Sequence, residues 1–167
     1  MIVTRSIAHL REQREAWRKA GEMVGLVPTM GALHTGHLSL VERAQAYSTL
    51  TLVTLFVNPT QFAPGEDFDR YPRDEAGDLA KLEGAGVAAV FAPEVAEMYP
   101  EGSLTRVSVP QLGDVLEGEF RPGFFTGVAT VVAKLLILVQ PDVALFGEKD
   151  YQQLLVIRRL AADLHLP

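Results

Sequence analysis

Residues 23–37 read MVGLVPTMGALHTGH, an apolar run that passes through a glycine-containing loop into a helical pattern. Such a run of Val and Leu, ended by loop-forming residues, predicts a buried strand over Met23–Pro28 and a loop over Thr29–Thr35. Apolar residues then recur at helical spacing, which predicts a helix over Gly36–Tyr47. A strand, a loop and a helix in succession are the first part of a βαβ unit.

The same alternation recurs outward along the chain, and Ser6 is a plausible N-cap for a leading helix through Ala20. The remaining predicted strands are Leu50–Val57, Val87–Phe91 and Val143–Phe146, and the remaining predicted helices are Arg73–Ala85, Phe125–Val139 and Asp150–Leu164. Strands that alternate with helices are typical of a parallel sheet covered on both faces. The chain is therefore expected to be a single α/β domain over residues 1–167.

The composition is that of a folded, acidic domain. Hydrophobic residues make up 48% of the 167 residues and charged residues 22%, which places the chain far from disordered sequences. The 15 Lys and Arg against 21 Asp and Glu leave a net charge of −6, so we expect no nucleic-acid partner. The absence of cysteine excludes thiolate nucleophiles and cysteine-ligated zinc.

No segment predicts a membrane partner. The apolar stretch of residues 124–139 is too short to cross a bilayer and contains Lys134, so a buried helix is the better interpretation. The first 17 residues contain no apolar segment ahead of their charges, which disfavours a secretory signal and favours a cytoplasmic location.

The loop after the first predicted strand brings two imidazoles to the start of a helix. His34 and His37 are three residues apart and are expected to share one face, where free N–H groups of the helix would add donors for phosphate oxygens. Gly36 would let a ligand approach the backbone. An arbitrary histidine pair is more often a surface or core pair, by roughly two to one. The strand–loop–helix context favours a phosphate site, while the lack of an HExxH motif disfavours zinc.

A second polar loop, FGEKD at residues 146–150, also follows a strand and opens a helix. Lys149 would place a positive charge on phosphate, and Asp150 would cap the helix and accept a ribose hydroxyl. Taken alone, GEKD is an ordinary solvated turn. Because ligands of open α/β sheets bind at the carboxyl ends of the strands, we expect this loop and the histidine loop to hold one polyphosphate between them.

A third polar loop, FVNPTQF, occupies residues 56–62 at the end of the second predicted strand. The amides of Asn58 and Gln61 beside Phe62 suit a small polar substrate with an apolar body, although an ordinary Asn-Pro turn is equally compatible with the sequence.

Other nucleotide and hydrolase motifs are missing or misplaced. Residues 84–89, GAGVAA, match the dinucleotide-binding pattern but follow a helix and enter a strand. No lysine follows a glycine, which excludes a Walker A loop, and no G-x-S-x-G occurs. The acidic residues between Glu66 and Asp78 are typical of a solvated loop and helix face, with a Mg²⁺ contact as the alternative.

Together, four motifs in order resemble the pantoate:beta-alanine ligase family over essentially all 167 residues. They are VPTMGALHTGH at 27–37, FVNPTQF at 56–62 with YPRD at 71–74, RPGFFTGV at 121–128, and FGEKDYQQL at 146–154. The resemblance implies a Rossmann-like nucleotidyltransferase fold, related to class I aminoacyl-tRNA synthetases, with residues 34–37 in the position of their HIGH motif. It also implies a homodimer.

The family resemblance implies a two-step reaction with ATP and Mg²⁺. The carboxylate of pantoate would attack the α-phosphate of ATP to give pantoyl adenylate and pyrophosphate, and the amine of beta-alanine would then displace AMP to give pantothenate. Alignment and charge placement supply most of the rate in such chemistry, so no covalent enzyme intermediate is expected.

The resemblance also assigns roles to matching positions. The residues implied to bind ATP, of which the first three are also implied to be catalytic, are His34, His37, Lys149, Met30, Gly36, Gly147 and Asp150. The residues implied to bind pantoate are Pro28, Met30, Gln61 and Gln153. Asp78 is implied, more weakly, to lie near Mg²⁺, which is expected to arrive mainly with ATP.

Two departures from the family accompany these assignments. Phe124 stands where the family usually carries a histidine, although Arg121 is retained. The family also continues beyond the position of Pro167 into a loop comparable to KMSKS and a C-terminal lid, so we expect this chain to be the N-terminal domain, poorly active by itself. The alternatives are a non-catalytic nucleotide-binding module of the same fold and a tRNA synthetase fragment, against which the acidic composition counts.

Overall fold

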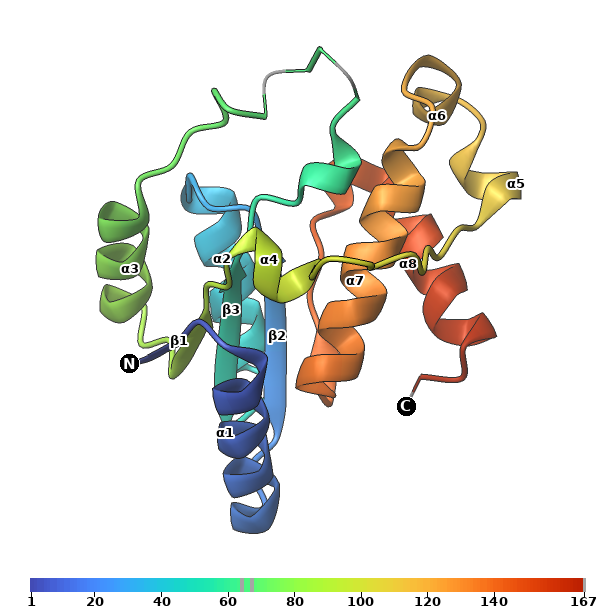
Figure 1. Cartoon of the computed structure of the whole chain (residues 1–167). Helices are drawn as coiled ribbons and strands as arrows, with labels where there is room; N and C mark the ends of the chain where they lie inside the picture. The colour runs from blue at the N-terminus through green and yellow to red at the C-terminus, as the bar shows by residue number, and fades with distance from the viewer. Residues whose placement is uncertain (64, 67, 167) are drawn as a thin grey trace.

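The computed structural model describes residues 1–63, 65–66 and 68–166, and its centre is a parallel β-sheet (Figure 1). The strands are β1 (Ile2–Thr4), β2 (Val24–Thr29), β3 (Leu50–Leu55), β4 (Ala89–Phe91) and β5 (Val143–Ala144). Their order in the sheet is β1-β4-β3-β2-β5, and every pairing is parallel. The predicted parallel sheet is therefore confirmed.

Helices connect the strands. The long helices are α1 (Ile7–Ala20), α2 (Thr35–Gln45), α3 (Glu75–Gly84), α7 (Phe124–Val139) and α8 (Tyr151–Asp163). The short ones are α4 (Val95–Met98), α5 (Pro110–Gly113), α6 (Glu117–Phe120) and the 3₁₀ turns η1 (Pro59–Gln61) and η2 (Glu148–Asp150). Among the described residues, no helix combines the length and the apolar character that a bilayer crossing requires.

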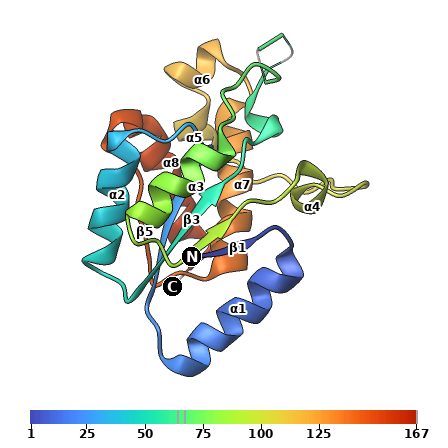
Figure 2. The same ribbon diagram turned by 90° about the vertical axis from the view of Figure 1, so that its left-hand side faces the viewer.

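Alternation along the strands divides the core into two apolar layers (Figures 1 and 2). Leu26 and Leu52 point to the face that α1 and α7 cover, whereas Val27 and Val53 point to the face that α2 and α3 cover. Successive strand residues face opposite sides, so a strand buried on both faces is mostly apolar. The central strands are therefore largely apolar runs, and a polar residue such as Thr29 is hydrogen-bonded to the neighbouring strand, where its hydroxyl donates to the Thr54 carbonyl at 2.6 Å.

Every predicted strand and helix is present, and most of their ends shift by one or two residues. Ser6 caps α1, its side chain accepting the His9 N–H at 3.2 Å, as expected. The strand β1 and the short helices α4 to α6 were not predicted. With three residues, β1 is too short to show a periodicity of its own, and its pairing with β4 defines it.

The strand order creates a switch point between β2 and β5. From β2 the chain passes to β3 and β4 on one side, then returns through α7 to place β5 on the other side of β2. The carboxyl ends of the two strands therefore lead into loops that diverge from neighbouring positions. Open α/β sheets bind their ligands at such a point.

Candidate active site

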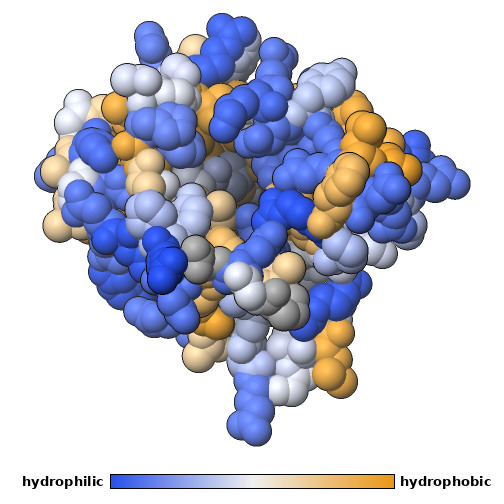
Figure 3. All heavy atoms as spheres, turned by 90° about the horizontal axis from the view of Figure 1, so that it is seen from above, coloured by the Kyte–Doolittle hydropathy of each residue, from blue (hydrophilic) through white to orange (hydrophobic). Residues whose placement is uncertain are grey.

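The histidine loop, residues 30–37, and the lysine loop, residues 146–150, leave the sheet from adjacent strands. Leu26 of β2 is in register with Ala144 of β5, and the Leu145 N–H donates to the Leu26 carbonyl at 2.9 Å. Because β2 and β5 pair in parallel, both loops begin at the same edge of the sheet. Figure 3 looks onto this end of the molecule, where the surface is hollowed between hydrophilic side chains.

His34 and His37 stack against each other at the first turn of α2. Their ring centroids lie 4.1 Å apart, which confirms that they share a face. His34 is the N-cap, and its Nδ1 accepts the Gly36 N–H at 3.1 Å, while His37 Nδ1 accepts the His34 N–H at 3.4 Å. A neutral ring that accepts at Nδ1 carries its proton on Nε2. Both rings thus keep an Nε2–H donor for a ligand.

Burial lowers the pKa of His37 below its usual value of 6.5, and the neighbouring His34 and Lys149 lower this pKa further, while Asp78 opposes them. The neutral imidazole is therefore the favoured form near neutral pH. In that form the His37 Nδ1 accepts the His34 N–H, and Nε2 carries the proton that can be donated to a ligand.

The backbone of the histidine loop is unusual because two successive residues are left-handed, Gly31 at φ +84° and Ala32 at φ +51°. For a residue with a Cβ this region costs roughly 1–2 kcal/mol. Asp78 of α3 compensates: its Oδ2 accepts the Ala32 N–H at 2.7 Å, and its Oδ1 accepts the Leu33 N–H at 2.8 Å. The carboxylate is 1% exposed.

This geometry bears on two sequence-based expectations. Among the described residues, no group of three or more His, Asp or Glu side chains is placed to hold a metal ion, and each oxygen of Asp78 accepts a backbone N–H of the loop. A contact of Asp78 with Mg²⁺ stays a prediction. On the side where a Cβ would stand, Gly36 is covered by the His34 ring, since a Cβ there would lie 2.9 Å from His34 Cε1.

The lysine loop is open by comparison. Gly147, Lys149 and Asp150 are all exposed, and a Cβ at Gly147 would meet no atom within 4 Å. Asp150 occupies the N-cap position of α8, but its side chain makes no capping bond, so that prediction was wrong. The chain enters α8 through the 3₁₀ turn η2, and the extended backbone from which a side chain caps is missing.

Behind Gln61 lies a buried polar network. Asn58, 1% exposed, donates to Gln61 Oε1 at 3.0 Å and to the Gly127 carbonyl at 3.1 Å. Its Oδ1 accepts the Tyr99 hydroxyl at 2.9 Å and the Thr60 hydroxyl at 2.9 Å. Asn58 is thus not available to a substrate, contrary to the expectation from sequence. Tyr99, 38 residues beyond Gln61 and on another element, carried no signal in the sequence.

The network orients Gln61. With Oε1 held by Asn58, the Gln61 Nε2 turns toward Met30 and lies 3.1 Å from its Sδ. Pro28 lies two residues before Met30 and pairs with Thr54 of β3. Gln153 is half-buried in the first turn of α8, and in the described part of the chain its amide makes no hydrogen bond to these residues. The structure thus joins Gln61 and Met30 directly, but not Gln153.

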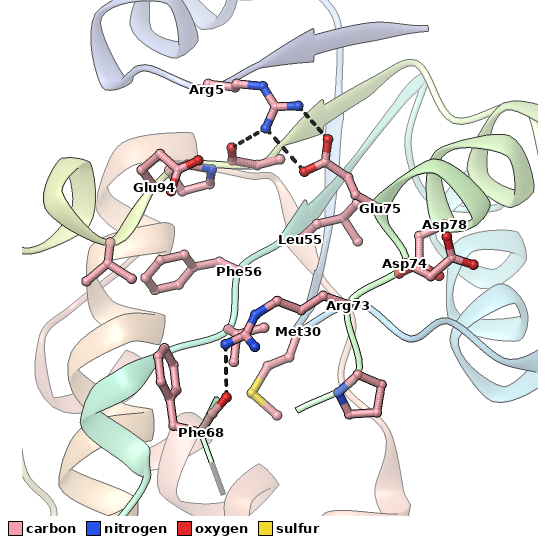
Figure 4. A pocket seen from close by; sticks show the side chains of 16 residues that line it. Arg5, Met30, Leu55, Phe56, Phe68, Arg73, Asp74, Glu75, Asp78 and Glu94 are labelled. Atoms are coloured by element: carbon pink, nitrogen blue, oxygen red, sulfur yellow. Dashed lines mark hydrogen bonds and ion pairs between the residues drawn. The ribbon is translucent and has the colours of Figure 1, made fainter. Parts of the chain in front are cut away.

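A pocket of about 190 Å³ opens beside Met30 (Figure 4). Phe56 and Phe68 line its apolar part, and Arg73 donates to the Phe68 carbonyl at 2.9 Å. The ion pair of Arg5 with Glu75 closes its far rim. The lining also includes the carboxylates of Asp74, Glu75 and Glu94, so this pocket as a whole does not attract an anion.

A smaller pocket of about 100 Å³ is lined in part by Gln61. Arg121 bounds it, 2.8 Å from Glu66 and 3.8 Å above the ring of Phe124. The Arg121 guanidinium lowers the pKa of Glu66 to about 2. The ring of Phe124 therefore serves as a stacking partner for Arg121.

Comparisons with known proteins identify the family of this chain. The family model described as pantoate-beta-alanine ligase matches residues 2–167. A pantothenate synthetase from Hyphomonas neptunium is 61% identical over 165 residues, which cover 99% of this chain and 56% of that protein. A second, from Paramagnetospirillum magneticum, is also 61% identical over 165 residues and is covered to 58%.

Solved structures give the same result. The pantothenate synthetase of Thermus thermophilus has a TM-score of 0.94 at 55% identity, covering 100% of this chain and 59% of that one. The pantoate-beta-alanine ligase of Francisella tularensis, solved with beta-gamma ATP and beta-alanine, has a TM-score of 0.95 at 39% identity, covering 99% and 64%. These likenesses confirm the Rossmann-like nucleotidyltransferase fold.

The chain spans somewhat less than three fifths of the length of these curated relatives. Over that span the match is continuous and includes all four motifs that the sequence presents. The chain belongs to the pantoate-beta-alanine ligase family.

Proposed function

We propose that residues 1–167 form the ATP- and pantoate-binding domain of a ligase that condenses pantoate with beta-alanine to pantothenate. One observation carries the proposal: the loop of the stacked His34 and His37 and the loop of the exposed Lys149 follow the adjacent parallel strands β2 and β5 at the switch point. This is a site for a polyphosphate. The Francisella tularensis relative, solved with a form of ATP and with beta-alanine, supports the same ligands here.

In the first step, a carboxylate oxygen of pantoate attacks the α-phosphorus of ATP. An O–P bond forms, the bond to the bridging oxygen of the β-phosphate breaks, and pyrophosphate leaves. His34, His37 and Lys149 hold the β- and γ-phosphates and take up the charge that develops on the leaving group. In the second step, the beta-alanine amine attacks the acyl carbon, AMP leaves, and the amine proton passes to solvent.

The pantoate carboxylate must be held for in-line attack. Gln61 presents an Nε2 donor beside Met30, and we assign pantoate to this region, with Pro28 and Gln153 lining it. The Asn58 network fixes the Gln61 amide before the substrate arrives, which lowers the entropy lost on binding.

The rest of the nucleotide is assigned to the two loops. Gly147 and Asp150 lie near the ribose in this proposal, with Met30 and Gly36 completing the ATP site. The open space at Gly147 and the exposed Asp150 carboxylate support a ribose there. Mg²⁺ is proposed to enter with the phosphates of ATP, and no step is assigned to the ion because the described residues offer it no ligand cluster.

Two further proposals concern the whole protein. Leu116 and Phe120 are 69% and 83% exposed, which supports a homodimer in which a second copy covers these side chains. Sedimentation equilibrium should give a dimer for the wild type and a monomer for Phe120→Glu, and a monomeric wild type would remove this proposal. Because ATP is the proposed co-substrate, we keep the cytoplasm as the proposed location.

Calorimetric titration of the chain with pantoate, with and without ATP, tests the function. We expect each ligand to tighten the binding of the other, and pantoate-dependent exchange of pyrophosphate into ATP to fall about 100-fold in His37→Ala. Binding of ATP that is indifferent to pantoate would instead identify a non-catalytic nucleotide-binding module. Undiminished exchange in His37→Ala would remove the role of His37.

A further inference from the structure

Helix α3 hydrogen-bonds the histidine loop through two side chains that have no part in the proposed reaction. Asp78 accepts two consecutive backbone N–H groups, from Ala32 and Leu33, at 2.7 and 2.8 Å. Lys81, one turn along the helix, donates to the Leu33 carbonyl at 2.9 Å and lies 3.4 Å from Asp78 Oδ1. Three backbone groups of the loop are therefore fixed from one helix.

The free-energy cost of burying the Asp78 carboxylate indicates what this arrangement contributes. A buried carboxylate is unfavourable unless it is paired and hydrogen-bonded, and Asp78 is 1% exposed. It also places a negative charge behind a loop proposed to bind a polyanion, which weakens the attraction of that loop for phosphate. The charge of Asp78 therefore does not favour phosphate, and any benefit to ATP binding must come from its hydrogen bonds.

These hydrogen bonds act on the shape of the loop. The left-handed backbone at Ala32 persists only if its surroundings hold it, and Asp78 bonds the N–H of that residue. The Asp78 Oδ2 also lies 3.1 Å from the position of a Cβ at Gly31, so the carboxylate packs against the turn. Leu33 is buried and leads directly into His34, the N-cap of α2. The position of the imidazoles is set through this chain of contacts.

We propose that Asp78 and Lys81 form a clamp that positions His34 and His37 for the phosphates of ATP, so that both act as positioning residues. The clamp rests on the proposed function for its ligand, but its geometry does not. It uses both oxygens of Asp78 within the protein.

The charge of Asp78 makes the test decisive, because two effects have opposite signs. If Asp78 acted on ATP by charge alone, Asp78→Asn would strengthen ATP binding. If it positions the loop, Asp78→Asn weakens ATP binding about tenfold, since an amide can accept only one of the two N–H bonds and turns a second donor toward the other. Glu83→Gln removes the same charge from an exposed site on α3 and should bind ATP at least as well as the wild type.

Three readouts on the chain separate the outcomes. Affinity for MgATP is measured by calorimetry, amide hydrogen exchange at Ala32 and Leu33 by mass spectrometry or NMR, and the pKa of His37 by NMR. In Asp78→Asn we expect faster exchange at both amides with the strands still protected. The pKa of His37 should fall further, because Asp78 faces the ring together with His34 and Lys149 and is the group that raises it.

The clamp is overturned if Asp78→Asn binds MgATP as tightly as the wild type or more tightly. If Asp78→Asn does not fold, Lys81→Met is tested in its place. Lys81 is half exposed, and its replacement removes the ion pair of Asp78 but buries no new charge. Lys81→Met should weaken ATP binding about threefold and speed exchange in the loop, and no change in either would overturn the clamp. A wild type that binds no ATP contradicts the proposed function instead, and exchange together with the pKa of His37 then decides on the clamp.

Discussion

The two loops at the switch point are built in opposite ways. The histidine loop is braced from behind by Asp78 and Lys81 and is closed in front by reciprocal bonds between His34 and the first turn of α2. The lysine loop has three exposed polar positions and no side-chain cap on α8. One loop presents donors in a fixed geometry, and the other offers a charge on a long side chain whose order comes with the ligand.

The largest expected effect lies in the braced loop. Gly31→Ala forces a Cβ into a left-handed backbone at φ +84° and against Asp78 Oδ2, 3.1 Å away. We expect the free energy of unfolding to fall by about 3 kcal/mol, from backbone strain and loss of the carboxylate bonds. Urea unfolding measures it.

Gly21→Ala is the matched control, because Gly21 has φ +74° but a Cβ at this position would meet no atom within 4 Å. It should lose only the strain part, about 1 kcal/mol. Equal losses at the two glycines would show that Asp78 contributes nothing to the rigidity of the braced loop.

In the open loop, Lys149→Ala should affect binding and leave stability alone. A charged contact to phosphate contributes roughly 1.5–3 kcal/mol, so ATP affinity should fall about 10- to 100-fold. The melting temperature should not change, because Lys149 is exposed. Lys19→Ala, in an exposed ion pair with Glu15 at 3.6 Å, controls for the loss of a surface charge. A lower melting temperature in Lys149→Ala would mean that this loop is braced as well.

A third, smaller effect tests whether the Asn58 network holds Gln61 as firmly as Asp78 and Lys81 hold the histidine loop. Tyr99→Phe removes the hydroxyl that donates to Asn58 Oδ1 at 2.9 Å. The loss of one such bond should cost about 1 kcal/mol of stability and weaken pantoate binding a few-fold with ATP binding unchanged. Equal losses for both ligands would contradict a network that serves the pantoate side alone.

The sequence was informative where local chemistry decides the structure. Strand runs of Val and Leu, the Ser6 cap and the polar loops after β2 and β5 predicted the sheet, α1 and the place of the site. The sequence did not predict contacts between distant segments. Asp78 hydrogen-bonds Ala32, 46 residues away, and Tyr99 hydrogen-bonds Asn58, 41 residues away. Neither residue type nor spacing encodes such a contact. Two assignments were wrong. Asn58 was expected to be free to bind a substrate, and Asp150 was expected to form a local capping bond on α8.

The smallest effect is electrostatic and reports on the distance between the two loops. The pKa of His37 lies below its usual value, so the unfolded chain binds more protons just below pH 6.5. The contribution of His37 to stability is therefore complete above pH 6.5 and declines as the pH falls toward the folded-state pKa. Lys149→Gln removes one cause of the lowering, and the pKa of His37 should rise.

The dependence on salt then distinguishes the histidine loop from the lysine loop. The exposed charge of Lys149 is screened on a scale of about 10 Å at 0.1 M salt, so the rise in the pKa of His37 caused by Lys149→Gln should shrink as salt is added. The fall caused by Asp78→Asn should persist, because a buried carboxylate is screened much less. NMR titrations of His37 at low and high salt measure both shifts. If both shifts vanish together in high salt, the carboxylate acts through solvent and not from behind a closed loop.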